Sequence, residues 1–202
     1  MQAFLVSRAL LPEAAALCIA PAAMPHSPSS TDDKHGRAIV LVGLMGAGKS
    51  TVGRRLAQRL NLPFVDADTE IETAAGMTVS EIFARFGEAH FRDGERRVIA
   101  RLITGEPRVI ATGGGAFIQD ETRALILDNT LSVWLDASPE VLVARVGRRD
   151  TRPLLREGDP RAILEELARV RNPIYALAHL RVVSQHAPHD ATVNAILKAI
   201  GL

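Results

Sequence analysis

Cysteine and aromatic residues are scarce in this chain of 202 residues. Cys18 is the only cysteine, which excludes an intramolecular disulfide and a cysteine-rich zinc site. A single thiol is consistent with a reducing compartment, so we expect the protein in the cytoplasm. Aromatic residues make up 4% and hydrophobic residues 47% of the chain, and a core must therefore consist mainly of Leu, Ile, Val and Ala.

An excess of charge of one sign is also missing. The chain has 24 basic and 23 acidic residues, which gives a formal net charge of +1. This balance does not favour nonspecific binding to nucleic acids or to membrane surfaces. No apolar run approaches the length of a membrane span, and the 6 histidines form no HExxH zinc motif. We therefore expect neither a nucleic-acid partner nor a membrane partner.

Residues 1–36 differ in composition from the rest and predict a disordered N-terminal tail. Ala20-Pro21-Ala22 resembles the cleavage site of a targeting peptide, but Arg8 is the only basic residue upstream of it. The alternative is an optional tail, with Met24 as the true start, and we favour it. A single folded domain is expected at 37–202.

The stretch Gly43-Leu44-Met45-Gly46-Ala47-Gly48-Lys49-Ser50 fits the phosphate-loop pattern, Gly-x4-Gly-Lys-Ser/Thr. Its glycines allow the backbone to wrap around phosphate oxygens, with N–H groups pointing inward. Lys49 can reach the β- and γ-phosphates, and the Ser50 hydroxyl can bind Mg²⁺. The candidate ATP-binding residues of the loop are Gly46, Ala47, Gly48, Lys49, Ser50 and Thr51.

The sequence on both sides of this loop supports the assignment. A continuous aliphatic run at 38–42 precedes it, as expected of a buried parallel strand. Val52, Leu56 and Leu60 follow at intervals of four residues, which indicates one face of a helix. The alternative is a glycine-rich turn that matches by chance, and the strand–loop–helix order argues against it.

Strands and helices alternate after residue 37, which predicts an α/β fold with a mostly parallel sheet covered on both faces. The predicted strands are 37–42, 63–65, 108–111, 131–135 and 180–184. The predicted helices are 49–60, 69–75, 80–86, 88–102, 120–127, 139–146, 161–172 and 190–200.

Two segments do not fit the simple alternation. Residues 68–104 form a long helical insertion between the second and third strands. Residues 147–160 are rich in Gly, Pro and Arg and lack periodicity, as expected of a mobile lid over phosphates. A solvated surface loop is the alternative for this second segment.

Carboxylates follow the second predicted strand rather than the third. Asp66 and Asp68 come at the end of the second strand, and an extended segment would point both side chains the same way. One of the two could then hold the water shell of the metal while the other faces an acceptor hydroxyl. Alternatively, Asp68 simply caps the helix that begins at Thr69.

The third strand ends in Thr112 and the triplet Gly113–Gly115. Glycines at this position permit the close approach of backbone N–H groups to a ligand. A plain tight turn is the alternative, although one glycine would normally suffice for it.

Together these motifs resemble the shikimate kinase family. The phosphate loop is followed by Asp66-Ala67-Asp68, and Phe91-Arg92 precedes the glycine triplet. The later motifs are Arg152-Pro153-Leu154-Leu155 and Arg171-Asn172-Pro173-Ile174-Tyr175. Their order and spacing match those of the family from residue 38 to about residue 185.

The resemblance implies a P-loop kinase fold of the nucleoside monophosphate kinase type. It has three α/β/α layers and a five-stranded parallel sheet of order 2-3-1-4-5. It also implies an ATP-dependent and Mg²⁺-dependent enzyme that phosphorylates the 3-hydroxyl of shikimate, a step of chorismate and aromatic amino-acid biosynthesis. The expected partners are ATP and shikimate, and we expect a monomer.

The resemblance also implies roles for single residues. Arg92 and Arg171 match the arginines that bind the carboxylate of shikimate, and a guanidinium fork suits that planar group. Asp68 matches the residue that binds the ring hydroxyls and can accept a proton.

The other implied positions surround these three. Gly114 and Gly115 match substrate-binding positions, and Arg152 matches the lid arginine that contacts both substrates. The resemblance places Arg145 and Pro153 beside the adenine, and Phe83, Phe91 and Glu95 around Arg92. The catalytic set is Lys49, Asp68 and Arg152, and the metal ligands are Ser50 and Asp66.

Two other functions remain open at this point. One is a kinase of the same fold for another sugar acid, such as gluconate, although the motifs from Phe91 to Arg152 argue against it. The other is a nucleotide-binding protein without catalytic activity, which would be expected to have lost Lys49, Asp68 or Arg152.

Overall fold

The computed structural model of the chain describes residues 36–146, 159–184 and 188–202. The described residues belong to one compact unit. All but the last residue of the predicted tail, and most of the predicted lid at 147–160, lie outside the described residues, so the domain boundaries stay predictions. No helix in the described part is long and apolar enough to span a membrane.

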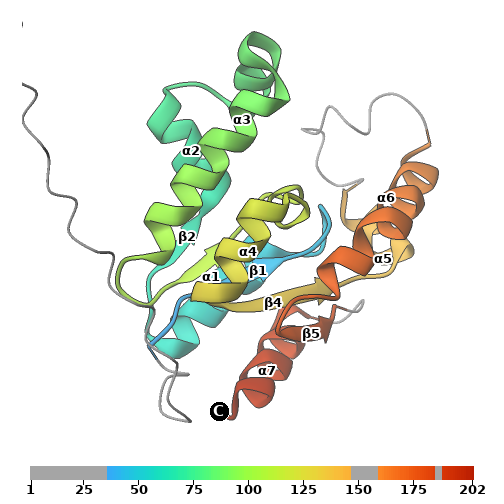
Figure 1. Cartoon of the computed structure of the whole chain (residues 1–202). Coiled ribbons are helices and arrows are strands. Elements are labelled where there is room, and N and C mark those ends of the chain that lie inside the picture. Colours follow the sequence, from blue (N-terminus) through green and yellow to red (C-terminus); the bar gives the residue numbers. More distant parts are fainter. Residues whose placement is uncertain (1–35, 147–158, 185–187) are drawn as a thin grey trace, which may run out of the picture. The chain divides into compact units, whose positions relative to one another are not determined.

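Five parallel strands form one sheet with the order β2-β3-β1-β4-β5 (Figure 1). This confirms the fold class and the strand order expected from the sequence. The strands are β1 (Ile39–Val42), β2 (Phe64–Asp66), β3 (Val109–Ala111), β4 (Leu131–Asp136) and β5 (Leu180–Val183).

The register of the strands aligns their carboxyl ends. Leu41 pairs with Ala111 on one side and with Val133 on the other, and Ala111 pairs with Asp66. Asp66 therefore lies in the same row as Leu41, two residues before the phosphate loop begins at Gly43. In a parallel sheet this edge is where ligands bind.

Helices lie on both faces of the sheet. On one face α1 and α7 pack together, and α4 lies against the other (Figure 1). The helices are α1 (Lys49–Leu60), α2 (Ala67–Ala75), α3 (Val79–Ile103), α4 (Asp120–Asn129), α5 (Pro139–Val146), α6 (Pro160–Tyr175) and α7 (His189–Ile200). A short 3-10 helix, η1 (Ala116–Ile118), precedes α4.

Aliphatic side chains dominate the core, as the composition requires. All four residues of the central strand β1 are buried, and they pack with Leu56 of α1, Ile110 of β3 and Val133 of β4. A second, smaller apolar cluster holds α2 and α3 together and consists of Ile71, Ile82 and Phe91. The helical insertion therefore has a packing centre of its own.

The structure confirms one predicted break and corrects several helix ends. The predicted helices 80–86 and 88–102 are joined in α3, and Gly87 separates them as predicted, because its non-helical φ of 80° is rarely adopted by residues with a Cβ. Helix α2 begins at Ala67 rather than Thr69. Helix α6 continues through Pro173 to Tyr175 instead of ending at Asn172.

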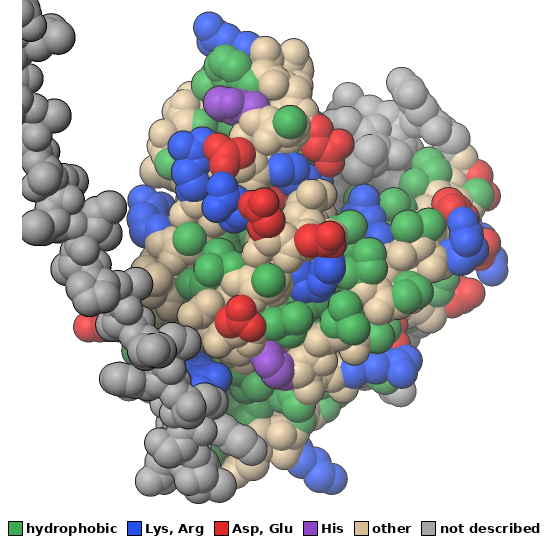
Figure 2. Space-filling view, in the orientation of Figure 1, with side chains coloured by type: hydrophobic (Ala, Val, Ile, Leu, Met, Phe, Trp, Pro, Cys, Tyr) green, Lys and Arg blue, Asp and Glu red, His purple; other side chains and the backbone are tan. Residues whose placement is uncertain are grey.

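Charged side chains of both signs are interspersed on the face drawn in Figure 2. Many of them form exposed ion pairs, such as Arg96 with Asp93 at 2.9 Å and Arg101 with Glu70 at 2.9 Å. Exposed pairs of this kind contribute little to stability. The mixture agrees with the nearly neutral net charge.

Candidate active site

A pocket of about 660 Å³ opens at the carboxyl edge of the sheet. Twelve of the predicted site residues line it, and they come from segments far apart in the sequence. These residues are Gly46, Gly48, Lys49, Ser50, Thr51, Asp66, Asp68, Arg92, Gly114, Gly115, Arg145 and Arg171. The structure thus brings the predicted site together, while the roles of the residues stay predictions.

The phosphate loop leads directly into α1. Gly48 is the N-cap residue with a φ of 99°, and its carbonyl accepts a hydrogen bond from Val52 N at 2.8 Å. The Lys49 ammonium donates to the carbonyls of Gly43, at 2.7 Å, and Leu44, at 3.0 Å. Lys49 is therefore held over the loop, where the N-terminus of α1 also favours an anion.

Asp66 uses both carboxylate oxygens. Oδ2 accepts a hydrogen bond from the Ser50 hydroxyl at 2.6 Å, and Oδ1 accepts from the backbone N–H of Asp68 at 3.2 Å. Asp66 is thus the N-cap of α2, and the alternative that Asp68 caps this helix is wrong. Since β2 ends at Asp66, the assumption that both aspartates lie in an extended segment is also wrong.

The Ser50–Asp66 pair fits a magnesium ion that is shared with phosphates. Both groups are hard oxygen donors on the same side of the phosphate loop, and Mg²⁺ commonly takes one or two protein ligands together with substrate phosphates. The described residues contain no group of three or more His, Cys, Asp or Glu side chains able to hold a metal. A cage made by this part of the protein alone is therefore absent.

Gly113 lies between two carboxylates. A Cβ at Gly113 would lie 2.7 Å from Asp68 Oδ1 and 3.1 Å from Glu95 Oε1. Glu95 is buried, and burial raises its pKa even though the ion pair with Arg92 acts in the opposite direction. The glycine thus allows Asp68 and Glu95 to approach the loop closely.

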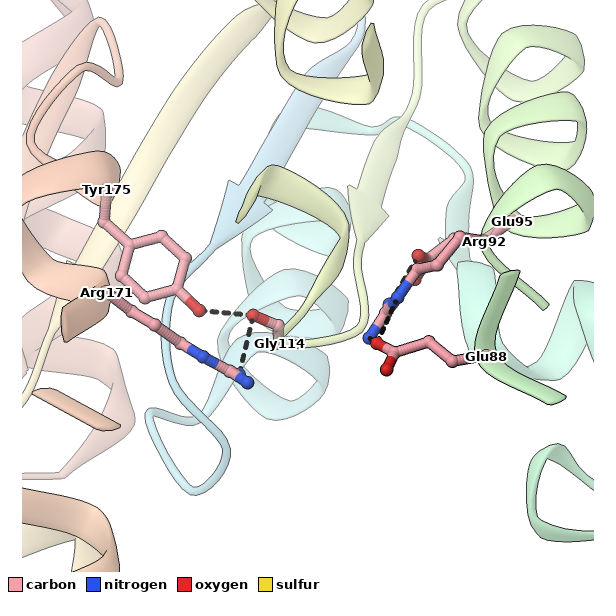
Figure 3. A network of polar contacts seen from close by, with 6 residues as sticks. All are labelled: Glu88, Arg92, Glu95, Gly114, Arg171 and Tyr175. Atoms are coloured by element: carbon pink, nitrogen blue, oxygen red, sulfur yellow. Dashed lines mark hydrogen bonds and ion pairs between the residues drawn. The ribbon is translucent and has the colours of Figure 1, made fainter. Parts of the chain in front are cut away.

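Arg92 projects from α3 and is held by two acidic residues (Figure 3). Its Nη1 donates to Glu95 Oε2 at 2.7 Å, and its Nε and Nη2 donate to Glu88 Oε1 at 3.2 Å. The guanidinium also lies 5.1 Å from the ring centre of Phe91 and 5.9 Å from that of Phe83. The three residues predicted to surround Arg92 therefore do so.

These contacts keep Arg92 charged in spite of its burial. Burial by itself would lower the pKa of Arg92, but the hydrogen bonds and charges of Glu95 and Glu88 outweigh burial, and the pKa is raised. The guanidinium is thus a fixed cation at the wall of the pocket.

Arg171 and Tyr175 approach the glycine triplet from the opposite side (Figure 3). Both belong to α6, four residues apart and hence on one face of the helix. Arg171 Nη1 lies 3.5 Å from the Gly114 carbonyl oxygen, and the Tyr175 hydroxyl donates a hydrogen bond to the same oxygen. Arg92 and Arg171 thus flank the triplet as two separate cations.

The triplet does form a tight turn, because the Ala116 N–H donates to the Gly113 carbonyl at 3.3 Å, but the turn alone does not account for three glycines. None of its three glycines has a positive φ, so the backbone conformation does not require glycine. The available space does require glycine, because a Cβ at Gly115 would lie 2.6 Å from Arg92 Nη1 and a Cβ at Gly113 would meet Asp68. The missing side chains make room for the charged groups around the loop.

Arg145 and His189 complete the side of the pocket next to the phosphate loop. Arg145 Nη1 donates to the Ala47 carbonyl at 3.1 Å and to Ser184 Oγ at 2.9 Å, and burial lowers the pKa of Arg145. The ring of His189, at the start of α7, would lie 3.4 Å from a Cβ at Gly48.

The remaining predicted residues do not line the described pocket. Ala47 is buried, and it contributes its carbonyl as an acceptor for Arg145. Arg152 and Pro153 lie outside the described residues.

The sequence reasoning missed six residues that line the pocket: Glu72, Val79, Ser80, Thr112, Val146 and His189. Thr112 and His189 carried a usable signal, because each follows a strand at the edge where the phosphate loop lies. Glu72, Val79 and Ser80 reach the pocket only through the packing of α2 against α3.

Comparisons with known proteins point to one family. The family model described as "Shikimate kinase" matches residues 45–201. A shikimate kinase from Bradyrhizobium diazoefficiens is 57% identical over 164 residues, which cover 81% of this chain and 79% of that protein.

Solved structures distinguish the two kinase candidates. A shikimate kinase from Acinetobacter baumannii, solved in complex with shikimate, has a TM-score of 0.78 and 37% identity, and the match covers 83% of this chain and 94% of that one. A gluconokinase from Sinorhizobium meliloti has a TM-score of 0.55 and 20% identity, over 81% of this chain and 91% of that one, which shows a shared fold alone.

Proposed function

This chain belongs to the shikimate kinase family, and we propose that its pocket transfers the γ-phosphoryl group of ATP to the 3-hydroxyl of shikimate. One observation carries the proposal. A phosphate loop, the carboxylate of Asp68 and two separate arginines, Arg92 and Arg171, meet around one glycine triplet. The pocket therefore combines a place for a polyphosphate with a place for a small acid that bears hydroxyl groups.

The nucleotide half of the pocket is made by the phosphate loop and α5. Loop N–H groups and the Lys49 ammonium bind the β- and γ-phosphates, and Arg145 packs on the loop beside the base. Ser50 and Asp66 would hold Mg²⁺, which would neutralise phosphate charge when bound. The carboxylate of Asp66 is already positioned by its second bond, to the backbone of Asp68.

The acceptor half is made by α3, α6 and the triplet. Arg92 and Arg171 bind the shikimate carboxylate from two sides, and the backbone of Gly114 and Gly115 contacts the ring substituents. Asp68 accepts hydrogen bonds from ring hydroxyls and turns the 3-hydroxyl toward the phosphate loop.

Phosphoryl transfer in this pocket depends on position and charge more than on proton removal. The transition state is loose, so the nucleophile needs little deprotonation early in the reaction. The main effect of Asp68 is thus to orient the hydroxyl, and Lys49 stabilises the charge that develops on the transferred group. Arg152 lies outside the described residues, and its contact with both substrates stays a prediction, as do the cytoplasmic location and the monomeric state.

The direct test is ADP release by the purified protein with ATP, Mg²⁺ and either shikimate or gluconate. We expect release that depends on shikimate, with Lys49→Ala as the matched inactive control. Release with gluconate alone would show that the acceptor is wrong. ATP binding without release for either acid would favour the noncatalytic alternative.

A further inference from the structure

Tyr175 contacts the acceptor site without lining the pocket. Its side chain is fully buried at the end of α6, and its hydroxyl donates to the carbonyl oxygen of Gly114. Burial between protein groups removes it from direct contact with a ligand. Any effect of Tyr175 on the reaction must therefore be transmitted through Gly114.

We propose that Tyr175 is a positioning residue, which fixes the Gly114–Gly115 peptide so that the Gly115 N–H faces the bound acceptor. This inference rests on the proposed function, because it assigns the peptide to the shikimate side of the pocket.

The orientation follows from the geometry of the peptide bond. No peptide in the described residues is cis, and in a planar trans peptide the C=O and the following N–H point in opposite directions. The Gly114 carbonyl points toward Tyr175 and Arg171, away from Arg92 (Figure 3). The Gly115 N–H therefore points toward the side of the triplet where Arg92 lies.

Close contacts place this peptide between Arg92 and the phosphate loop. A Cβ at Gly115 would lie 2.6 Å from Arg92 Nη1, so the peptide and the guanidinium are neighbours. A Cβ at Gly114 would lie 3.5 Å from the backbone nitrogen of Met45, which places the same peptide against the phosphate loop. A rotation of the peptide would turn the N–H away from an acceptor held by Arg92.

The ring of Tyr175 is rigidly placed for this task. It stacks with Phe117, at a centroid distance of 6.4 Å, and with Trp134, at 6.2 Å. Burial raises the pKa of Tyr175 to about 12, so the hydroxyl keeps its proton near neutral pH and remains a donor. Arg171 reaches the same carbonyl only at 3.5 Å, which is long for a hydrogen bond, and cannot replace the hydroxyl.

The test compares Tyr175→Phe with a matched variant, Thr130→Val. Tyr175→Phe keeps the buried ring and removes only the hydroxyl. Thr130 is also buried, and its hydroxyl donates to the Ile126 carbonyl at 2.6 Å. It is the C-cap of α4 and does not line the pocket. Each variant thus loses one buried O–H···O=C bond, and only one of them touches the triplet.

We expect Tyr175→Phe to raise the KM for shikimate about 3- to 10-fold, as the loss of one hydrogen bond would, with the KM for ATP changed less than about twofold. Thr130→Val should lower the melting temperature about as much as Tyr175→Phe does, and it should leave both KM values unchanged. The fluorescence of Trp134, the single tryptophan, gives the shikimate Kd independently of turnover.

A second measurement follows the amide resonance of Gly115 in the Gly114–Gly115 peptide. Shikimate should shift the Gly115 amide resonance in the wild type and in Thr130→Val, and by much less in Tyr175→Phe. An unchanged shikimate KM and an unchanged amide shift in Tyr175→Phe would reduce Tyr175 to a stabilising residue and overturn the inference. Equal KM increases in both variants would overturn it as well. A wild type that releases no ADP with shikimate would instead overturn the proposed function, and the inference with it.

Discussion

Alanine substitutions along the glycine triplet should impair different steps of the reaction. The three positions are consecutive, and none needs a positive φ, so each substitution adds one methyl group without backbone strain. A Cβ at Gly113 would meet Asp68, and one at Gly115 would meet Arg92. A Cβ at Gly114 would only make ordinary contacts with the backbone of 43–45. We therefore expect three distinct phenotypes.

The contact distances set the size of each effect. The Asp68 oxygen lies 2.7 Å from the new methyl carbon of Gly113→Ala and must retreat by about 0.7 Å to reach an ordinary contact of 3.4 Å. A displacement of this order at a reacting group can cost up to about 100-fold in rate, so kcat should fall about 10- to 100-fold. In Gly115→Ala, Arg92 Nη1 must move by a similar amount from 2.6 Å.

Movement of Arg92 should mainly affect binding. The guanidinium would leave its 2.7 Å bond to Glu95, and charge-assisted bonds of this kind contribute about 1.5–3 kcal/mol. The KM for shikimate should therefore rise by about 10-fold or more, while the KM for ATP stays within about twofold. At Gly114 the new methyl would lie at an ordinary 3.5 Å contact, and this variant should show the smallest change of the three.

The assay is steady-state ADP release with each substrate varied in turn, together with the melting temperature of every variant. A Gly113→Ala enzyme with normal kcat would refute the placement of Asp68 beside the triplet. The reasoning would also fail if Gly114→Ala were the most impaired of the three. Equal losses of activity in all three variants, with equal decreases in melting temperature, would indicate that the loop has a purely structural role.

Five further variants test other parts of the structure. Asp68→Ala should lose most of kcat in the ADP-release assay, and a near-normal rate would contradict its orienting role. Arg92→Ala should weaken shikimate binding and spare ATP binding in titrations of each ligand; unchanged shikimate affinity would argue against the carboxylate clamp. Because burial raises the pKa of Glu95 above its ordinary value of 4.5, the folded state keeps the proton to higher pH than the unfolded state does. The unfolding free energy of the wild type should therefore fall relative to that of Glu95→Gln as pH rises above about 4.5, and parallel curves in urea titrations from pH 4 to 8 would refute this. Gly53→Ala should destabilise the protein by about 1–3 kcal/mol, because its Cβ would lie 2.6 Å from the partly buried ring of Phe64. Gly94→Ala meets nothing within 4 Å and should stabilise α3 by about 0.5–1 kcal/mol.

Local patterns in the sequence were sufficient to predict most of the fold. Helices α1 and α5 have the predicted bounds, because a phosphate loop fixes the start of one and Pro139 the start of the other. The boundary at Asn172 was wrong because Pro173 is tolerated inside α6. The Ala176 N–H still donates to the Asn172 carbonyl at 2.9 Å, so the helix closes its last turn beyond the proline.

The site was predictable where it depends on motifs and not where it depends on packing. The Asp66–Ser50 contact joins two motif residues at the carboxyl edge of the sheet, the edge at which parallel strands predict that both lie. Asp66 caps α2 instead of Asp68 because β2 continues directly into α2. The secondary-structure propensities of these residues do not indicate this direct continuation. The hydrogen bond from Tyr175 to Gly114 joins α6 to the loop after β3 and depends on how that helix lies on η1.

The two halves of the pocket are supported by different apolar clusters, which bears on how acceptors are distinguished. The phosphate loop is continuous with the main core around β1. Arg92 instead projects from a helix that is anchored by the small cluster of Ile71, Ile82 and Phe91. Substitutions in that cluster can move Arg92 without disturbing the sheet or Lys49. We therefore expect acceptor choice to depend on α3 and α6, where the two arginines are placed.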